Sequence, residues 1–98
     1  MVELISVVAE HKAKPGKEQA LRDMLLSLVE PTRKEEGCVQ YDLHVHLEDL
    51  GRFVFYENWT SHEALARHAG SAHIKRLRAA ESELLDAPAR VELYRRIA

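Results

Sequence analysis

The sequence predicts an α+β protein with one antiparallel sheet packed against helices. Three observations lead to this class: hydrophobic residues alternate with a period of two in some segments, recur with a helical period in others, and are separated by turn-forming residues. The 98 residues correspond to one domain, residues 1–98. A hydrophobic share of 46% and a charged share of 31% are ordinary for a globular domain.

The composition excludes several classes of protein. A formal charge of -2 gives no electrostatic footprint for nucleic acid, and no apolar segment is long enough to cross a bilayer. Cys38 is the only cysteine, so neither an internal disulfide nor a thiolate metal cluster can form. No secretory signal precedes the first strand-like run. We therefore expect a cytoplasmic protein that binds neither nucleic acid nor membrane.

The first third of the chain predicts a strand and a helix. Residues 2–12 are rich in Val, Ile and Leu without clean alternation, as in a strand that is covered on both faces. After a Pro-Gly turn at 14–17, one apolar helical stripe is formed by Leu21, Met24, Leu25, Leu28 and Val29. Pro31 is expected to end or kink this helix, and residues 33–36 can continue helically to Gly37.

The middle of the chain predicts a β-hairpin. Residues 38–47 alternate between apolar and polar side chains, a turn follows at 48–51, and residues 52–59 form the second strand. In that strand Phe53, Phe55, Glu57 and Trp59 share one face, and Val54, Tyr56 and Asn58 share the other. Both faces are largely apolar, so both are expected to be covered.

Two helices and a strand are predicted after the hairpin. Thr60 and Glu63 form the pattern of a capping box for a helix over 61–68, which Gly70 ends. Ser71 can cap a further helix that reaches about residue 85. Residues 89–97 form the last strand.

This order of elements is that of a ferredoxin-like βαββαβ fold with an antiparallel sheet. Helices cover one face of such a sheet and leave the other open. Because the strands carry apolar residues on both faces, a monomer would expose an apolar patch, and sheet-to-sheet homodimerisation is the simplest way to bury it.

Several short motifs in this order resemble one known family. They are Lys14-Pro15-Gly16, Glu35-Glu36-Gly37-Cys38, Tyr41, Glu57-x-Trp59, His68 and Ser71-Ala72-His73. Together they are similar to the antibiotic biosynthesis monooxygenase domain, whose members include small quinol monooxygenases and cofactor-independent oxygenases of aromatic polyketides. The resemblance implies a homodimer that forms a dimeric α+β barrel.

The same fold also hosts haem-degrading monooxygenases, autoinducer phosphate isomerases and members without established activity, so fold alone does not fix the chemistry. The haem degraders use an asparagine on the first strand, and residues 2–12 contain none. No Gly-rich phosphate loop or dinucleotide fingerprint is present, so no flavin or nicotinamide site is expected. A deprotonated quinol can itself give an electron to dioxygen. The leading hypothesis is a monooxygenase that oxidises a quinol or polyphenol with dioxygen and needs no cofactor or metal.

Proton transfer is assigned to histidine, which titrates near neutrality. His68 and His73 are both candidate bases, and His73 lies in the first turn of its helix, where the helix dipole favours the neutral ring. The alternative is that either one caps a helix or packs beside Trp59 with its nitrogens satisfied. Glu57 is expected to be paired, either as the orienter of a histidine or with Arg52 or a backbone amide, and a supporting role is favoured over direct catalysis.

The expected substrate contacts are aromatic and polar-tipped side chains. Trp59 offers a flat wall on which a ring can stack, although a strand-end Trp is more often core. Tyr41, Tyr56 and Asn58 are expected to line the pocket or to form hydrogen bonds with the polar groups around it. Asn58 and Trp59 point to opposite faces, so one of them is expected at the dimer interface rather than in the pocket.

Two rival functions and one metal arrangement stay open. A proton-transfer isomerase of a small phosphorylated, sugar-like ligand would use the same acid and bases, with a phosphate clamp drawn from Arg67, Lys75, Arg76 and Arg78. A non-catalytic ligand-binding dimer would have its pocket filled by side chains. His44 and His46 share one strand face and could meet His11 on a metal, but polar-face or dimer contacts are the favoured interpretation.

Overall fold

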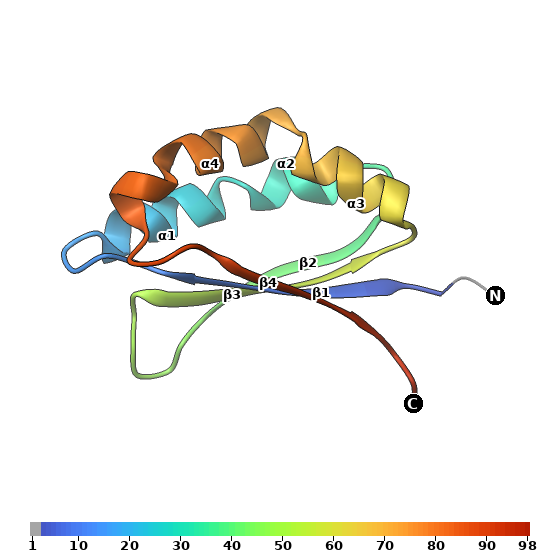
Figure 1. Ribbon diagram of the computed structural model, residues 1–98, viewed down its shortest axis with the longest axis horizontal. Helices are drawn as coiled ribbons and strands as arrows, with labels where there is room; N and C mark the ends of the chain where they lie inside the picture. The colour runs from blue at the N-terminus through green and yellow to red at the C-terminus, as the bar shows by residue number, and fades with distance from the viewer. Residues whose placement is uncertain (1–2) are drawn as a thin grey trace.

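The computed structural model describes residues 3–98 and has the predicted α+β class. Its elements are β1 (Ile5–Lys12), α1 (Glu18–Leu26), α2 (Val29–Arg33), β2 (Cys38–Val45), β3 (Arg52–Trp59), α3 (His62–Ala69), α4 (Ala72–Leu84) and β4 (Arg90–Arg95). All four helices lie on one side of the sheet (Figure 1). Among the described residues, none of the helices has the length and apolar character needed to cross a bilayer.

The sheet is antiparallel throughout, with strand order β2-β3-β1-β4, which confirms the ferredoxin-like prediction. Its register lines up side chains in rows across the face that the helices cover. Val7 of β1 lies opposite Glu57 of β3, and Glu57 lies opposite Tyr41 of β2. In the next row, Ala9 lies between Phe55 and Val91. These rows form the floor on which the helices pack.

The core lies between this floor and the helices. Its largest fully buried side chains are Trp59, Tyr41, Phe53, Phe55, Leu21, Leu25 and Leu28. The apolar stripe predicted at helical spacing supplies the three leucines. Because burial of a large apolar side chain contributes roughly 1.5–3 kcal/mol, these side chains account for much of the attraction between helices and sheet.

The break in the first helical segment occurs before the proline rather than at it. α1 ends at Leu26, α2 begins at Val29, and Pro31 lies in the first turn of α2. Proline is tolerated there because the first-turn N–H groups have no partner within the helix. α2 ends at Arg33, so the expected helical continuation to residue 36 does not occur.

The cap of α3 differs from the prediction by one residue. Ser61, not Thr60, precedes the helix, and its side chain accepts a hydrogen bond from the backbone N–H of Ala64. The capping-box prediction at Thr60 is therefore wrong. β3 continues to Trp59 and Thr60 forms the bend after it, so the helix begins one residue later than that cap would require. The predicted cap at Ser71 is confirmed: its side chain accepts a hydrogen bond from the N–H of Ile74.

The face of the sheet opposite the helices is more polar than predicted. Ser6 donates to the side-chain oxygen of Asn58 over 2.6 Å, and Asn58 in turn donates to Gln40 over 2.8 Å. Tyr56 and Tyr94 expose 38% and 52% of their surface on this face. Aromatic side chains therefore flank a hydrogen-bonded polar centre.

Candidate functional site

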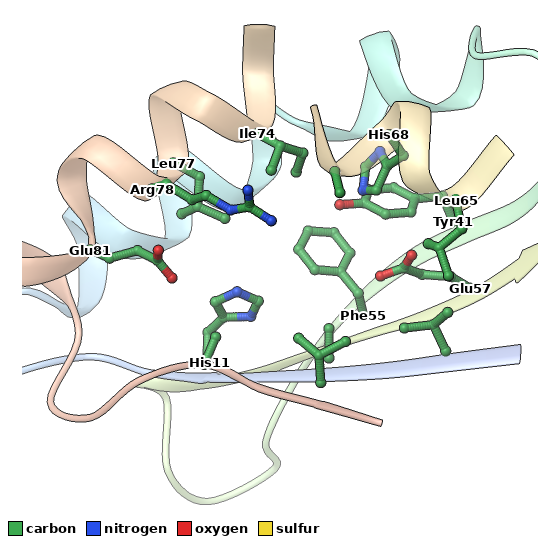
Figure 2. Close-up of a pocket in the computed structure, with 15 residues that line it drawn as sticks. His11, Tyr41, Phe55, Glu57, Leu65, His68, Ile74, Leu77, Arg78 and Glu81 are labelled. Atoms are coloured by element: carbon green, nitrogen blue, oxygen red, sulfur yellow. The ribbon is translucent and has the colours of Figure 1, made fainter. Parts of the chain in front are cut away.

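A cavity of about 230 Å³ lies between the sheet and the helices α3 and α4. Its wall is formed mainly by apolar side chains: Val7, Ala9, Phe55, Leu65, Ala69, Ile74, Leu77, Ala89 and Val91. Polar groups gather at its two ends (Figure 2). His68, Tyr41 and Glu57 lie at the α3 end, and His11, Arg78 and Glu81 lie at the other. A largely apolar cavity with a few polar groups is the usual form of a small-molecule site.

Glu35 joins the two histidines that the sequence singled out. Its Oε2 atom lies 2.7 Å from Nδ1 of His68 and 2.9 Å from Nε2 of His73. The side chains of all three residues are largely buried. Glu35 comes from the loop between α2 and β2, whereas the histidines come from α3 and α4, so three separate segments meet at one oxygen atom.

This arrangement fixes the tautomer of His68. An ionised carboxylate can only accept hydrogen bonds, so the ring nitrogen that faces Glu35 must carry the proton. Burial lowers the pKa of His68, an effect that outweighs the opposing pull of Glu35, and the ring is therefore neutral at pH 7. A neutral ring with its proton on Nδ1 has a free electron pair on Nε2. In Figure 2 the second ring nitrogen of His68 lies on the edge that faces the cavity.

Aromatic packing holds the ring of His68 in this orientation. The ring centroid lies 4.7 Å from that of Trp59 and 5.4 Å from that of Tyr41. Trp59 has no exposed surface and is not part of the cavity wall, so the stacking surface expected from it is turned toward His68 instead. The wall itself contains Phe55, which stacks on Tyr41 at 4.4 Å.

Glu57 is paired, but with Trp59 rather than with a histidine. The indole Nε1 donates to Oε1 of Glu57 over 2.8 Å. The orienting role expected of Glu57 is therefore filled by Glu35. Burial raises the pKa of Glu57 to about 7, while the bond from Trp59 opposes that rise, so this carboxyl titrates near neutrality in the cavity wall.

The three remaining predicted contacts divide between the two faces of the sheet. Tyr41 lines the cavity, and burial raises its pKa far enough that the hydroxyl stays protonated at pH 7. Tyr56 and Asn58 lie on the opposite face, because β3 alternates and Phe55 and Glu57 face the helices. Asn58 is held there by Ser6 and makes no contribution to the cavity wall.

Glu35 is the residue that sequence reasoning missed. It appeared only within the Glu35-Glu36-Gly37-Cys38 motif, where nothing links it to positions more than 30 residues later. The signal that could have found it is Gly37, which has a positive φ of 88°. A glycine in this conformation marks a turn whose shape is constrained, and this turn carries Glu35 to the histidines.

The far end of the cavity carries a second set of polar groups. His11 is buried on β1 and its Nδ1 atom has no hydrogen-bond partner within residues 3–98. Burial lowers the pKa of His11 to about 4, so this ring is also neutral. Arg78 and Glu81 of α4 line the same end.

One group of side chains has the composition of a metal site. Glu35, His68 and His73 each offer a donor atom, and these atoms lie within 4.8 Å of one another, so a divalent cation could replace the two shared protons. His68 and His73 are five residues apart in the chain, which is not the i, i+4 spacing of a helical zinc site. His46, considered with His44, instead accepts hydrogen bonds from the backbone N–H groups of Glu48 and Asp49 in the hairpin turn.

Comparison with known proteins agrees with the fold. Residues 4–80 match the family model described as antibiotic biosynthesis monooxygenase. The chain is 38% identical to "Putative monooxygenase Rv0793" of Mycobacterium tuberculosis over 91 residues, which span 93% of this chain and 89% of that protein. It is 36% identical over 85 residues to "Putative monooxygenase YcnE" of Bacillus subtilis, with 87% and 90% covered.

Solved structures give the same result. The crystal structure of PA3566 from Pseudomonas aeruginosa superposes with a TM-score of 0.93 at 35% identity and covers 100% of this chain and 97% of that one. The structure of Rv0793 gives a TM-score of 0.90 at 35% identity, with 97% and 96% covered. The chain belongs to the antibiotic biosynthesis monooxygenase family.

Proposed function

We propose that this protein is a monooxygenase that oxidises a single-ring quinol or related phenol with dioxygen, without a cofactor. The observation that carries this proposal is the position of His68. Its Nδ1 atom lies 2.7 Å from Glu35, its ring lines an apolar cavity of about 230 Å³, and burial lowers its pKa, which favours the neutral ring. A positioned base beside an apolar cavity can ionise a phenolic hydroxyl, which has a reference pKa near ~10.

The chemistry requires only the substrate and dioxygen as reactants. His68 Nε2 takes the proton of the hydroxyl, and the resulting anion gives an electron to dioxygen. In the complete reaction, a quinol and dioxygen yield a hydroxyquinone and water: one oxygen atom enters the ring and the other leaves as water. The quinol supplies all the electrons, so no external reductant is needed. The protein must move protons, hold the anion and exclude bulk water.

Two residues beside His68 support this role. Glu57 has a pKa of about 7 and lines the cavity, so it can return a proton to the reduced oxygen atom. Tyr41 keeps its hydroxyl proton and can donate a hydrogen bond to a bound oxygen atom. His73 bonds to Glu35 and is not part of the cavity wall, so we assign it a positioning role through Glu35.

Cavity size favours small substrates. Apolar cavities of about 150 Å³ accept a benzene molecule, so about 230 Å³ suits one substituted ring better than a polycyclic polyketide. This unfilled volume also favours a ligand-binding site over a dimer whose pocket is filled. The isomerase alternative is less well supported, because of its four candidate phosphate-binding cations only Arg78 lines the cavity.

We also propose that the protein is a cytoplasmic homodimer that forms through its sheet faces. The support is the exposed aromatic surface on the sheet face opposite the helices, where Tyr56 and Tyr94 expose 38% and 52% of their surface in the single chain. On the helix-covered side of the edge strand β4, Val91 and Leu93 expose 55% and 49% of theirs. Val91 also lines the cavity, so a second chain packed against β4 would help to close it.

The test of the function is dissolved-oxygen consumption by metal-stripped protein with a panel of single-ring quinols, corrected for autoxidation. We expect protein-dependent uptake that falls about 10²–10⁴-fold in His68→Ala, the range for loss of a general base. His62→Ala is the matched control, because His62 is exposed on the same helix. We expect a smaller loss in His73→Ala. Absence of uptake across the panel, or full uptake by a folded His68→Ala variant, would refute the proposal.

A further inference from the structure

Arg78 is a cation of the cavity that the proposed reaction does not use. It lies on α4 next to Leu77 and one turn after Ile74, and both of these neighbours are apolar wall residues. Figure 2 shows its guanidinium group directed into the cavity, between Ile74 and His11 and facing the ring of Phe55. A charged group with this orientation is positioned to contact whatever occupies the space.

Five other arginines of this chain already have side-chain partners. Arg33, Arg52, Arg90 and Arg95 each form an ion pair with a carboxylate. Arg76, two residues before Arg78, donates to the hydroxyl of Ser27 outside the cavity. In contrast, within residues 3–98 the guanidinium of Arg78 takes part in no ion pair or side-chain hydrogen bond. Its donor groups are therefore available to a ligand.

The other charged and titratable groups that line the cavity do not pair with this cation. Glu81 follows Arg78 by one turn on α4 and lines the same cavity, yet no ion pair joins them, and Figure 2 shows the Glu81 carboxylate beyond Leu77. His11 lies on the facing strand and is neutral. At the α3 end, His68 is neutral as well, and Glu57 titrates near neutrality. An anionic group bound beside Arg78 would therefore meet a guanidinium group that no carboxylate of residues 3–98 has already paired.

The charge of Arg78 also acts at the other end of the cavity. Burial is the main reason for the lowered pKa of His68, and Arg78 contributes to that lowering. The two side chains therefore interact electrostatically across the space in which a ring would lie. The same positive charge would stabilise an anion that forms between them.

We propose that Arg78 forms an anion subsite, so that the preferred ligand is a single-ring phenol or quinol whose hydroxyl faces His68 and whose carboxylate faces Arg78. This inference rests on the proposed function for the orientation of the hydroxyl. Guanidinium and carboxylate can pair through two parallel hydrogen bonds, which gives direction as well as affinity. The apolar wall between the two polar ends contacts the ring. A ligand with one polar group at each end matches this distribution of polar groups.

The test is equilibrium binding, which needs no turnover. Trp59 is the only tryptophan and its ring lies 4.7 Å from that of His68, so its fluorescence can report occupancy, with calorimetry as a second method. The probes are para-hydroxybenzoate and para-hydroxybenzamide, which have nearly the same shape and differ in charge. We expect the carboxylate to bind at least tenfold more tightly at fixed ionic strength, as is typical of a charge-assisted contact.

Variants at two arginines separate the subsite from general electrostatics. Arg78→Gln should abolish the preference for the carboxylate and change the affinity for the amide by no more than about twofold. Arg78→Lys should retain part of the preference, because lysine keeps the positive charge but cannot form the two parallel hydrogen bonds of a guanidinium group. Arg76→Gln removes the same charge two residues away and should keep the preference intact.

Three outcomes would overturn this inference: equal affinity for both probes in the unmodified protein, an unchanged preference in Arg78→Gln, or no binding of either probe at millimolar concentration. Each is distinguishable from failure of the proposed function, because binding is measured without oxygen consumption. Conversely, a preference for the carboxylate that depends on Arg78 would stand even if no quinol in the panel were oxidised.

Discussion

Glu35 and His68 are joined by a 2.7 Å hydrogen bond between Oε2 and Nδ1, although 33 residues separate them in the chain. This one contact selects the tautomer of the only histidine at the α3 end of the cavity wall. The same oxygen atom of Glu35 also bonds to Nε2 of His73, which lies outside the cavity wall. The geometry of the candidate site therefore depends on a loop residue as much as on the helices.

Removal of this carboxylate should lower activity without emptying the cavity. Glu35→Ala leaves both ring N–H groups without their acceptor, so His68 can adopt either tautomer and turnover should fall about 10²-fold. Glu35→Gln should be intermediate, because its carbonyl oxygen can still accept a hydrogen bond. Oxygen uptake gives the rate, and nitrogen NMR of His68 reports the tautomer directly. Glu36→Ala, an exposed neighbour, is the control. A Glu35→Ala variant with an unchanged tautomer would contradict this role.

Substitution of Gly37 should be costly for two separate reasons. The residue has a φ of 88°, and a Cβ atom there would overlap the side chains of Ala64 and Thr60. Backbone strain of roughly 1–2 kcal/mol and overpacking of roughly 1–3 kcal/mol should together lower the free energy of unfolding by about 2–5 kcal/mol in Gly37→Ala.

Gly16 provides the matched comparison for Gly37. Its φ is 84°, but nothing lies within 4 Å of the position of an added Cβ atom. Gly16→Ala should therefore cost only the backbone term, about 1–2 kcal/mol. Urea denaturation measures both variants. Equal losses at the two glycines would show that contact with α3 is unimportant.

Glu57 should make stability depend on pH in a predictable direction. Its folded-state pKa of about 7 lies above the reference value of 4.5, because burial disfavours the charged form. Its favourable contribution is fully present below about pH 4.5 and is lost as the pH rises through about 7. Glu57→Gln keeps an acceptor for Trp59 but cannot ionise. The difference in free energy of unfolding between this variant and the unmodified protein should therefore shift in favour of the variant by up to about 3 kcal/mol from pH 4.5 to pH 8. Glu48→Gln, at an exposed position, should show no such trend.

His11 should act in the opposite pH range. Its folded-state pKa of about 4 lies below the reference value of 6.5, so its contribution is present above about pH 6.5 and is lost as the pH falls through about 4. On acidification from about pH 6.5 to below about pH 4, His11→Leu should therefore lose less free energy of unfolding than the unmodified protein, by up to about 3 kcal/mol. Thermal unfolding over a series of pH values measures the change, with exposed His62→Gln as the control. An unchanged acid profile would mean that His11 gains a partner when it is protonated.

Local pattern was sufficient to predict most of the fold. Alternation located β3 at residues 52–59 with its bounds correct, and helical spacing located Leu21, Leu25 and Leu28 in the core. Errors occurred where two local signals competed. Thr60 and Ser61 are both good capping residues, and the choice between them depended on how far β3 extends. Pro31 was expected to interrupt a helix, but it lies in a first turn, where it costs little.

The candidate site was predicted in part. His68, Tyr41 and Glu57 line the cavity, whereas Trp59 packs behind His68, and Tyr56 and Asn58 lie on the other face of the sheet. The period of two already separated Tyr56 and Asn58 from Glu57, but periodicity does not say which face carries the helices. That choice follows from which set of side chains the helices bury.

The sequence by itself determined the order of the elements, the faces of the strands and the supply of acid, base and aromatic groups, because these depend on residues close together in the chain. The tertiary structure decided which groups meet. Only the packing of the α2–β2 loop against α3 and α4 brings Glu35 to both histidines, and only the sheet register places Glu57 beside Val7 and Tyr41. The physical reason is that hydrogen bonding and burial depend on distance in space. Spacing along the chain does not show which distant segments come into contact, because packing of the core brings them together.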